Sequence, residues 1–159
     1  MSKAGPHEIW VATWGDGMFK LDVKARQAHP ESFSGIENPV NCALDIVQMS
    51  NGEVWVASAG DGAYYRDTNG RWQRLHMTDS QVNHPDLWPI SSVEGKDGTC
   101  WILTTRTLWQ HSKDGKYVSK LPDVITLKTH NPLVMADALV DDDGTLYVAG
   151  NEGIIRFYP

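Results

Sequence analysis

The sequence predicts an all-β fold assembled from four similar units. Three observations lead to this prediction: an aromatic residue recurs at a fixed interval, a turn precedes three of its four copies, and a loop ending in glycine follows three of them. The aromatic residues stand at positions 10, 55, 101 and 147, at intervals of 45, 46 and 46 residues. Because one period is shared by several features, we interpret it as a structural repeat. The 159 residues are therefore expected to form a single domain with repeats at about 1–40, 41–86, 87–132 and 133–159.

Each unit has the pattern of four β-strands. In the second unit an apolar run around Ile46 ends at Asn51-Gly52, a dipeptide that favours a tight hairpin because both residues accept positive φ. The next run, residues 54–58, is almost continuously apolar, as expected for a strand covered on both faces. A third strand around Tyr64 ends at the hairpin signal Asn69-Gly70, and a fourth begins at Trp72. The chain shows no helical periodicity of useful length.

Four-stranded units of this length, with an aromatic residue on the second strand, are typical of β-propeller blades. One small twisted sheet cannot cover its own two faces, whereas sheets stacked around an axis bury both. A β-sandwich also contains short strands and glycine turns, so it is the alternative, but it does not require a fixed period. We therefore predict a β-propeller of antiparallel four-stranded sheets.

The first and last blades are predicted to be incomplete. Counting from Ile9 to Pro159, the four units supply three, four, four and three strands, and residues 1–8 are candidates for the outer strand of the fourth blade. Three arrangements satisfy this count: a closed four-bladed ring with one reduced blade, two chains that together make eight blades, or part of a longer propeller. An incomplete blade exposes a sheet edge that recruits partners, so we favour an oligomer.

Composition excludes several classes of protein. Apolar residues make up 41% of the chain and charged residues 21%, as in ordinary globular domains. The net charge of −6 argues against nucleic-acid binding, and no apolar run approaches the length of a membrane span. The N-terminus lacks the features of a signal peptide, although a removed signal would leave no trace. Cys42 and Cys100 are too few for a disulfide framework or a zinc site, so we expect both to be small core residues.

Two stretches, residues 10–22 and 51–58, resemble the two-component-regulator propeller repeat, whose pattern is roughly D-G-x-L-W-[IV]-G-T-x-x-G-[LI]-x-[RK]-[YL]. The resemblance covers all four units. The fourth keeps residues 143–150 and 153–157, whereas the third departs at Arg106-Thr107, where the pattern has glycine. Streptogramin-lyase propellers are more loosely similar. The resemblance implies blades rather than a particular chemistry, and it implies an extracytoplasmic sensor domain, since most family members are of that kind.

The two faces of the predicted propeller differ. One carries short, regular hairpin turns such as Asp97-Gly98 and Asp114-Gly115, whose sequences are explained by turn geometry alone. The acidic turn Asp141-Asp142-Asp143-Gly144 lacks the spacing of a calcium loop. The other face collects irregular loops between the second and third strands and between blades. Irregular loops on a regular frame usually carry binding, so we expect any ligand on this loop face.

Two tryptophans and several polar residues are the candidates on the loop face. Trp14 and Trp88 lie outside the repeating aromatic positions, and each either stacks on a ligand ring or caps the hydrophobic rim. Asp16 and Asp61 either accept hydrogen bonds from ligand hydroxyls or satisfy their own loop backbone. Arg106 stands where the other units have Asp or Glu, which points to an anionic group or to an ion pair across the ring.

His84 and His130 lie 46 residues apart in equivalent loops, where a histidine pair would bind a metal or move protons. No third ligand accompanies them, so we predict no metal site and no cofactor. The complete predicted ligand-binding set is Trp14, Asp16, Asp61, His84, Trp88, Arg106, His130, Asn131 and Glu152.

Catalytic motifs are missing from the sequence: it has no G-x-S-x-G, H-E-x-x-H, P-loop or Rossmann glycine pattern. We therefore predict no catalytic residue and interpret the chain as a non-enzymatic binding or sensing module for a small molecule, glycan or peptide. One alternative is an assembly module that completes a larger propeller with another copy of itself or with the rest of a longer chain. The other is a lyase-type enzyme using His84, His130 and Glu152, which rests on analogy of fold alone.

Overall fold

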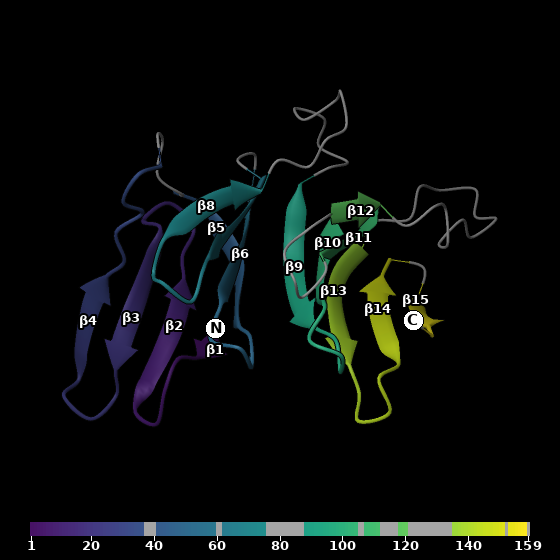
Figure 1. Cartoon of the computed structure of the whole chain (residues 1–159), viewed down its shortest axis with the longest axis horizontal. Helices are drawn as coiled ribbons and strands as arrows, with labels where there is room; N and C mark the ends of the chain where they lie inside the picture. The colour runs from purple at the N-terminus through teal and green to yellow at the C-terminus, as the bar shows by residue number, and fades with distance from the viewer. Residues whose placement is uncertain are drawn as a thin grey trace.

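A computed structural model of the chain describes residues 1–36, 41–59, 62–75, 88–104, 107–111, 118–120, 135–151 and 153–158. Within these residues the chain forms four antiparallel sheets and no helix, which confirms the all-β prediction. The sheets stand side by side in chain order, as the blades of a β-propeller do (Figure 1). The first and fourth sheets lie at the two ends of this row (Figure 1).

The first sheet has the order β1 (Ser2–Lys3), β2 (Glu8–Ala12), β3 (Met18–Asp22) and β4 (Gln27–Pro30). The second contains β5 (Ala43–Gln48), β6 (Val54–Ser58), β7 (Gly62–Arg66) and β8 (Trp72–Leu75). The third contains β9 (Pro89–Glu94), β10 (Cys100–Thr104), β11 (Leu108–His111) and β12 (Val118–Lys120). The fourth contains β13 (Met135–Val140), β14 (Leu146–Gly150) and β15 (Gly153–Phe157).

The fourth blade has three strands among the described residues and the first is completed only by a two-residue strand, because the N-terminal segment does not lie where the strand count suggested. Ser2 pairs with Trp10 and Lys3 with Ile9, so β1 is a two-residue inner strand of the first sheet and not the outer strand of the fourth. The inner strands β5, β9 and β13 each have six residues. The first blade therefore has a shortened inner strand, and the fourth has three strands among the described residues.

The hairpin turns repeat one geometry every 46 residues. At the first of them the carbonyl of Met49 accepts from the Gly52 N–H at 2.9 Å, and the Met49 N–H donates to the Glu53 carbonyl at 2.8 Å. The Asn51 side chain accepts from the Glu53 N–H at 2.9 Å, which explains the recurring Asn or Asp. Only the glycine has positive φ, 92° at Gly52, so this is a turn closed by a left-handed glycine and not the two-residue turn with positive φ at both positions.

The packing between sheets explains why the second strands are apolar on both faces. One face carries the repeating Trp10, Trp55 and Trp101, which are 1%, 0% and 3% exposed and which pack against the next sheet. The opposite face packs against the preceding sheet and carries the buried residues Val54, Val56, Cys100, Ile102, Leu146 and Val148. Cys100 is thus a core residue, as predicted, whereas Cys42 is only partly buried. Burial raises the pKa of the Cys100 thiol well above the usual value, with the charge of Glu53 as a smaller cause.

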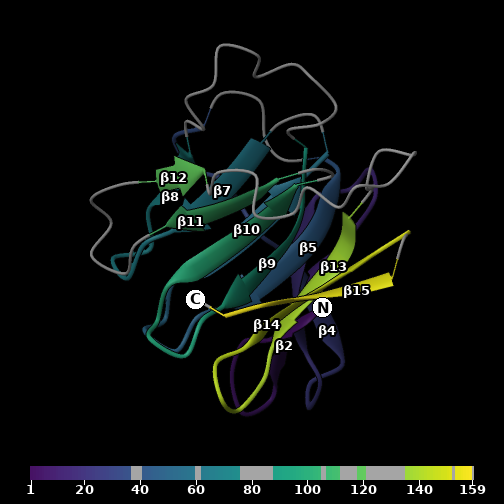
Figure 2. The same cartoon turned by 90° about the vertical axis from the view of Figure 1, so that its right-hand side faces the viewer.

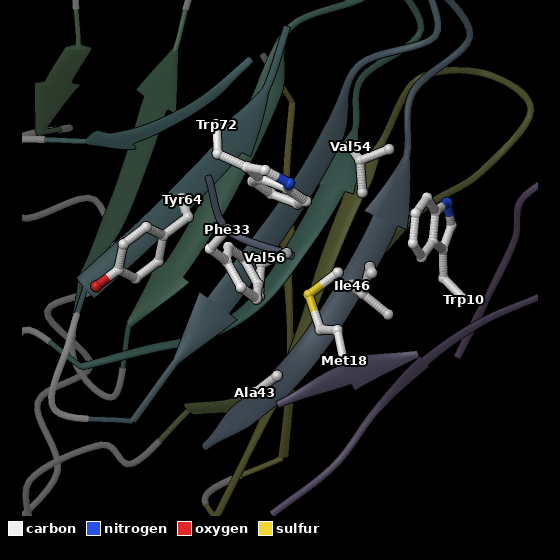
Figure 3. Packing of buried hydrophobic residues seen from close by; sticks show 9 residues of the cluster. All are labelled: Trp10, Met18, Phe33, Ala43, Ile46, Val54, Val56, Tyr64 and Trp72. Carbon is white, nitrogen blue, oxygen red and sulfur yellow. The ribbon is translucent and has the colours of Figure 1, made fainter. Parts of the chain in front are cut away.

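Figure 3 shows the junction between the first and second sheets. Met18 of β3 lies beside Ile46 of β5, and Trp10 of β2 faces the same strand. The indole Nε1 of Trp10 donates to Oε1 of Gln48 at 2.9 Å, so a polar contact closes the edge of this apolar junction. At the next junction the Ser50 N–H donates to Oε2 of Glu94 at 2.8 Å. The sheets are therefore joined by apolar contacts in the interior and by hydrogen bonds at the rim.

We expect Trp55→Ala to lower the free energy of unfolding by about 3–5 kcal/mol, because this fully buried ring fills the space between the second and third sheets. Trp14→Ala is the matched control: its ring is 73% exposed, so it should change stability by no more than about 0.5 kcal/mol. Urea denaturation measures both. Equal midpoints for the two variants would show that the junction packing is wrong.

Candidate functional site

The structure describes three of the nine predicted binding residues. Trp14 is 73% exposed, Trp88 is 38% exposed, and Asp16 is exposed. The other six lie outside the described residues: Asp61, His84, Arg106, His130, Asn131 and Glu152. Among the described residues, the candidate site therefore comprises the loop that carries Trp14 and Asp16, the start of β9, and the inner strands beneath them.

The loop that carries Trp14 is held firmly by backbone hydrogen bonds. The Gly15 and Gly17 N–H groups both donate to the carbonyl of Asn41, at 2.9 and 3.0 Å. The Ala43 N–H donates to the Thr13 carbonyl at 3.1 Å, and Trp14 forms an isolated antiparallel bridge with Cys42. The second-to-third-strand loop of the first blade is thus fastened to the start of the inner strand of the second. Its backbone is fixed while the indole of Trp14 lies in solvent.

Trp88 lies at the start of the inner strand of the third blade. It stands 46 residues after Cys42, directly before β9, just as Cys42 stands directly before β5. Because β5 packs against β9, the two tryptophans belong to neighbouring inner-strand starts on the loop face. Trp14 of the first blade, which bridges Cys42, and Trp88 of the third blade therefore lie at the starts of neighbouring inner strands, which their separation of 74 positions in the sequence does not indicate.

A polar row crosses the inner strands below this face. The Ser91 hydroxyl lies 3.1 Å from Oδ2 of Asp45 on one side and 3.1 Å from Oδ1 of Asp137 on the other. The backbone N–H of Ser92 also donates to Oδ2 of Asp45 at 2.9 Å. Ser91 is 3% exposed, so the row is a connection between the second, third and fourth blades. A hydroxyl has one hydrogen, so Ser91 donates to one carboxylate at a time.

Sequence reasoning missed this polar row. The signal was present, because positions 45, 91 and 137 are separated by 46 residues each, the period of the repeat itself. Taken alone, a polar residue at any one of these three positions is interpreted as a strand residue that faces solvent. The three residues form a hydrogen-bonded row only because the fold places β5, β9 and β13 side by side.

The described hollows lie near the hairpin turns and the N-terminus. One of about 420 Å³ is bounded by the turns of the third and fourth blades and by Trp101 and Tyr158. A second, of about 340 Å³, lies between Ser50, Glu94 and Asp142. A third, of about 420 Å³, is lined by Lys3, Ile9 and Val23 of the first blade. The face that carries the hairpin turns is therefore hollowed, although the turn sequences are short and regular.

The acidic turn of the fourth blade borders two of these hollows. A hydrogen bond with the Asp141 carboxyl, together with hydrogen bonds from Thr145, lowers the pKa of Asp143 to about 2. This carboxyl is consequently ionised at neutral pH, and the turn carries negative charge on the surface. Among the described residues no three His, Cys, Asp or Glu side chains are grouped to hold a metal ion.

No family model and no curated protein matches the sequence. Solved structures do match its fold. The extracellular domain of BT4673 from B. thetaiotaomicron, described as a one component system, has a TM-score of 0.79 at 15% identity over 100% of this chain and 20% of that one. The extracellular domain of BT3049 from the same organism, described as a hybrid two component system, has a TM-score of 0.71 at 18% identity over 96% of this chain and 20% of that one.

A streptogramin B lyase matches with a TM-score of 0.64 at 15% identity, over 99% of this chain and 53% of the lyase. These neighbours agree with both resemblances seen in the repeat, and they establish the fold: the chain is a β-propeller domain. It spans about a fifth of the length of the two extracellular domains and about half that of the lyase. Among the described residues no helix is long and apolar enough to cross a membrane.

We expect Ser91→Ala to destabilise the chain by about 1–3 kcal/mol, because it removes the donor shared by the Asp45 and Asp137 carboxylates on the two inner strands that flank β9. Ser92→Ala is the matched control. The Ser92 hydroxyl is buried without a hydrogen-bond partner, so its removal should be neutral or slightly stabilising.

Chemical denaturation of the two variants side by side measures the difference. If Ser92→Ala proves as costly as Ser91→Ala, the loss reflects burial of any side chain on β9 and not the polar row.

Proposed function

We propose that the chain is a non-enzymatic binding or sensing module whose ligand lies on the loop face against Trp14 and Trp88. The observation that carries the proposal is the 73% exposure of Trp14 on a loop whose backbone is fixed by hydrogen bonds. An exposed aromatic ring on a fixed backbone is a recognition surface whose loop needs little ordering on binding.

The contrast with the repeat tryptophans supports this assignment. Trp10, Trp55 and Trp101 are buried between blades, where their large apolar surfaces stabilise the fold. Trp14 covers little of the described core, which argues against a role in capping the rim. A large apolar side chain that stays in water does not contribute the roughly 1.5–3 kcal/mol of stabilising free energy that its burial would supply. Occupation by a ligand would recover that free energy.

The site favours an uncharged ligand with a flat or ring-shaped surface, such as a glycan or an aromatic peptide. Trp14 and Trp88 offer ring faces at the starts of the neighbouring inner strands β5 and β9, and the exposed Asp16 carboxylate accepts hydrogen bonds from hydroxyl or amide groups. The net charge of −6 weighs against nucleic acids and other polyanions. The extracellular sensor domains that share the fold support sensing as the use of this binding.

Fluorescence titration with a panel of neutral oligosaccharides and aromatic peptides tests the proposal. We expect at least one probe to shift the tryptophan emission, and we expect Trp14→Ala or Trp88→Ala to weaken its affinity at least tenfold, since a stacked ring contributes about 1–3 kcal/mol.

Tyr158→Ala is the matched control, because this aromatic residue is 65% exposed but lies beside the hairpin turns of the third and fourth blades. It should leave the affinity unchanged. A panel without any response, or a response that survives both tryptophan substitutions, would contradict the proposal.

An assembly module is the second candidate function, and it too is supported by a specific observation. Leu139 and Ile154 of the fourth sheet are 56% and 73% exposed. For the lyase-type alternative, the candidate acid and base residues His84, His130 and Glu152 lie outside the described residues. Its test is turnover of a cyclic ester or lactone that disappears in His84→Ala or His130→Ala while folding survives.

A further inference from the structure

The fourth sheet has one covered face and one exposed face. Its covered face packs on the third sheet through Leu146 and Val148, which are both fully buried. Its other face presents Leu139 and Ile154, at 56% and 73% exposure, and is turned toward the viewer in Figure 2. The two side chains lie on β13 and β15, and Tyr147 and Ala149 of β14 lie between them on the same face. Exposed apolar side chains on one sheet face are of the kind that marks an interaction surface.

Strand pairing shows what this exposed face corresponds to in the other sheets. Ile154 pairs with Ala149 just as Met18 pairs with Ala12 and Ala63 with Ala57. Met18 and Ala63 are 1% and 0% exposed, because each packs against the following sheet. The exposed face of the fourth sheet is therefore the half of a blade junction that elsewhere receives the next blade.

A contact on the exposed face of the fourth sheet matches contacts found on the junction faces of the first and second sheets. The guanidinium of Arg156 lies over the Tyr147 ring at 5.6 Å. At the same repeat position in the first blade, Lys20 lies over the Trp10 ring at 4.7 Å. In the second blade, the Tyr65 ring stacks on the Trp55 ring at 4.9 Å. The pairing register identifies the three contacts as equivalent.

The first sheet offers the complementary half. Ile9, Val11, Phe19 and Leu21 form the face of β2 and β3 opposite Trp10, and all four are only partly buried. Their counterparts in the following sheets include Val54, Val56, Ile102 and Val148, which are at most 1% exposed because each is covered by the preceding blade. A hollow of about 420 Å³ lined by Lys3 and Ile9 lies on this part of the first blade.

The exposed face of the fourth blade and the complementary face of the first blade also carry opposite charges at equivalent positions. In the junction between the second and third blades, Ser50 of one turn donates to the Glu94 carboxylate at the end of the neighbouring inner strand. By register, Asp142 is the fourth-blade counterpart of Ser50, and Lys3 is the first-blade counterpart of Glu94. Both side chains are exposed. A junction of the same geometry between a fourth and a first blade places a carboxylate against an ammonium group.

We propose that a second copy of this chain docks its first blade on the exposed face of the fourth blade, and that two such junctions close two copies into one propeller. The occupant is a second copy because the chain itself carries both halves, with matching apolar positions and opposite charges at Asp142 and Lys3. A head-to-tail contact of this kind forms a ring when the rotation between copies closes. The proposal is independent of ligand binding on the loop face.

Light scattering during size-exclusion chromatography of the 159-residue chain tests the pairing. The mass should rise with concentration to twice 17.7 kDa and no further. Ile154→Lys should hold the chain at the monomer mass, because it places a charge in the centre of the apolar junction. Trp14→Lys is the matched control, since it changes an equally exposed residue (73% in both) on the loop face, and it should dimerise like the unmodified chain.

A rescue experiment tests the register of the junction. Lys3→Glu should weaken dimerisation up to about tenfold, because repulsion from Asp142 replaces an attraction of ordinary surface strength. Adding Asp142→Ser should restore it, since serine and glutamate then reproduce the Ser50–Glu94 contact. Circular dichroism confirms that every variant keeps its strands.

Dimer loss in Ile154→Lys together with rescue in the double variant supports the proposal. A chain that is monomeric at every concentration overturns it and leaves the exposed face to a blade from the rest of a longer chain or from another protein. A dimer that ignores Ile154→Lys, or a Lys3→Glu defect that Asp142→Ser fails to repair, also overturns it, as does an assembly larger than two copies.

Discussion

The packing of one large side chain from each blade into the face of the next is the contact on which the rest of the structure depends. A sheet of four short strands has two apolar faces and can bury neither alone. Trp10, Trp55 and Trp101 solve this by filling the space between successive sheets, with at most 3% of each ring exposed. Stability is therefore a property of pairs of neighbouring sheets, as in other repeat proteins. Among the described residues, one face of the first sheet and one face of the fourth are not covered by a neighbouring sheet.

The repeat also divides the surface into two kinds. Where the chain must reverse within a blade, turns such as the one at Gly52 are fixed by a left-handed glycine and an Asn or Asp side chain, so they vary little. The opposite ends of the strands are not bound by this geometry. There the loop of Trp14 is tied to the start of β5, and an aromatic ring is held in solvent on a rigid frame. Binding is thus proposed at the loops, and assembly at the sheet faces.

Much of the fold could be predicted from the sequence because one period governs strands, turns and core together. Residues 54–58, for example, match β6 in both bounds. The two-residue strand β1 was misplaced, since Ser2 and Lys3 carry no strand pattern and only pairing with β2 defines them. The Asp45–Ser91–Asp137 row was missed because its hydrogen bonds exist only when three inner strands lie together. For the site, the sequence singled out Trp14 and Trp88, but their exposure depends on how neighbouring loops cover them. The roles of the other predicted binding residues remain predictions.

Amide hydrogen exchange resolved by sheet tests the central claim, that each sheet is stabilised by the neighbours that cover its faces. In dilute solution the amides of β6 and β10, which lie in sheets covered on both sides, should exchange slowest, and those of β2 and β14 in the terminal sheets should exchange faster. Raising the concentration should slow exchange in β2 and β14 selectively. Equal protection of all four central strands in dilute solution would contradict the account, because it would show that a terminal sheet is as stable with one neighbour as an inner sheet with two.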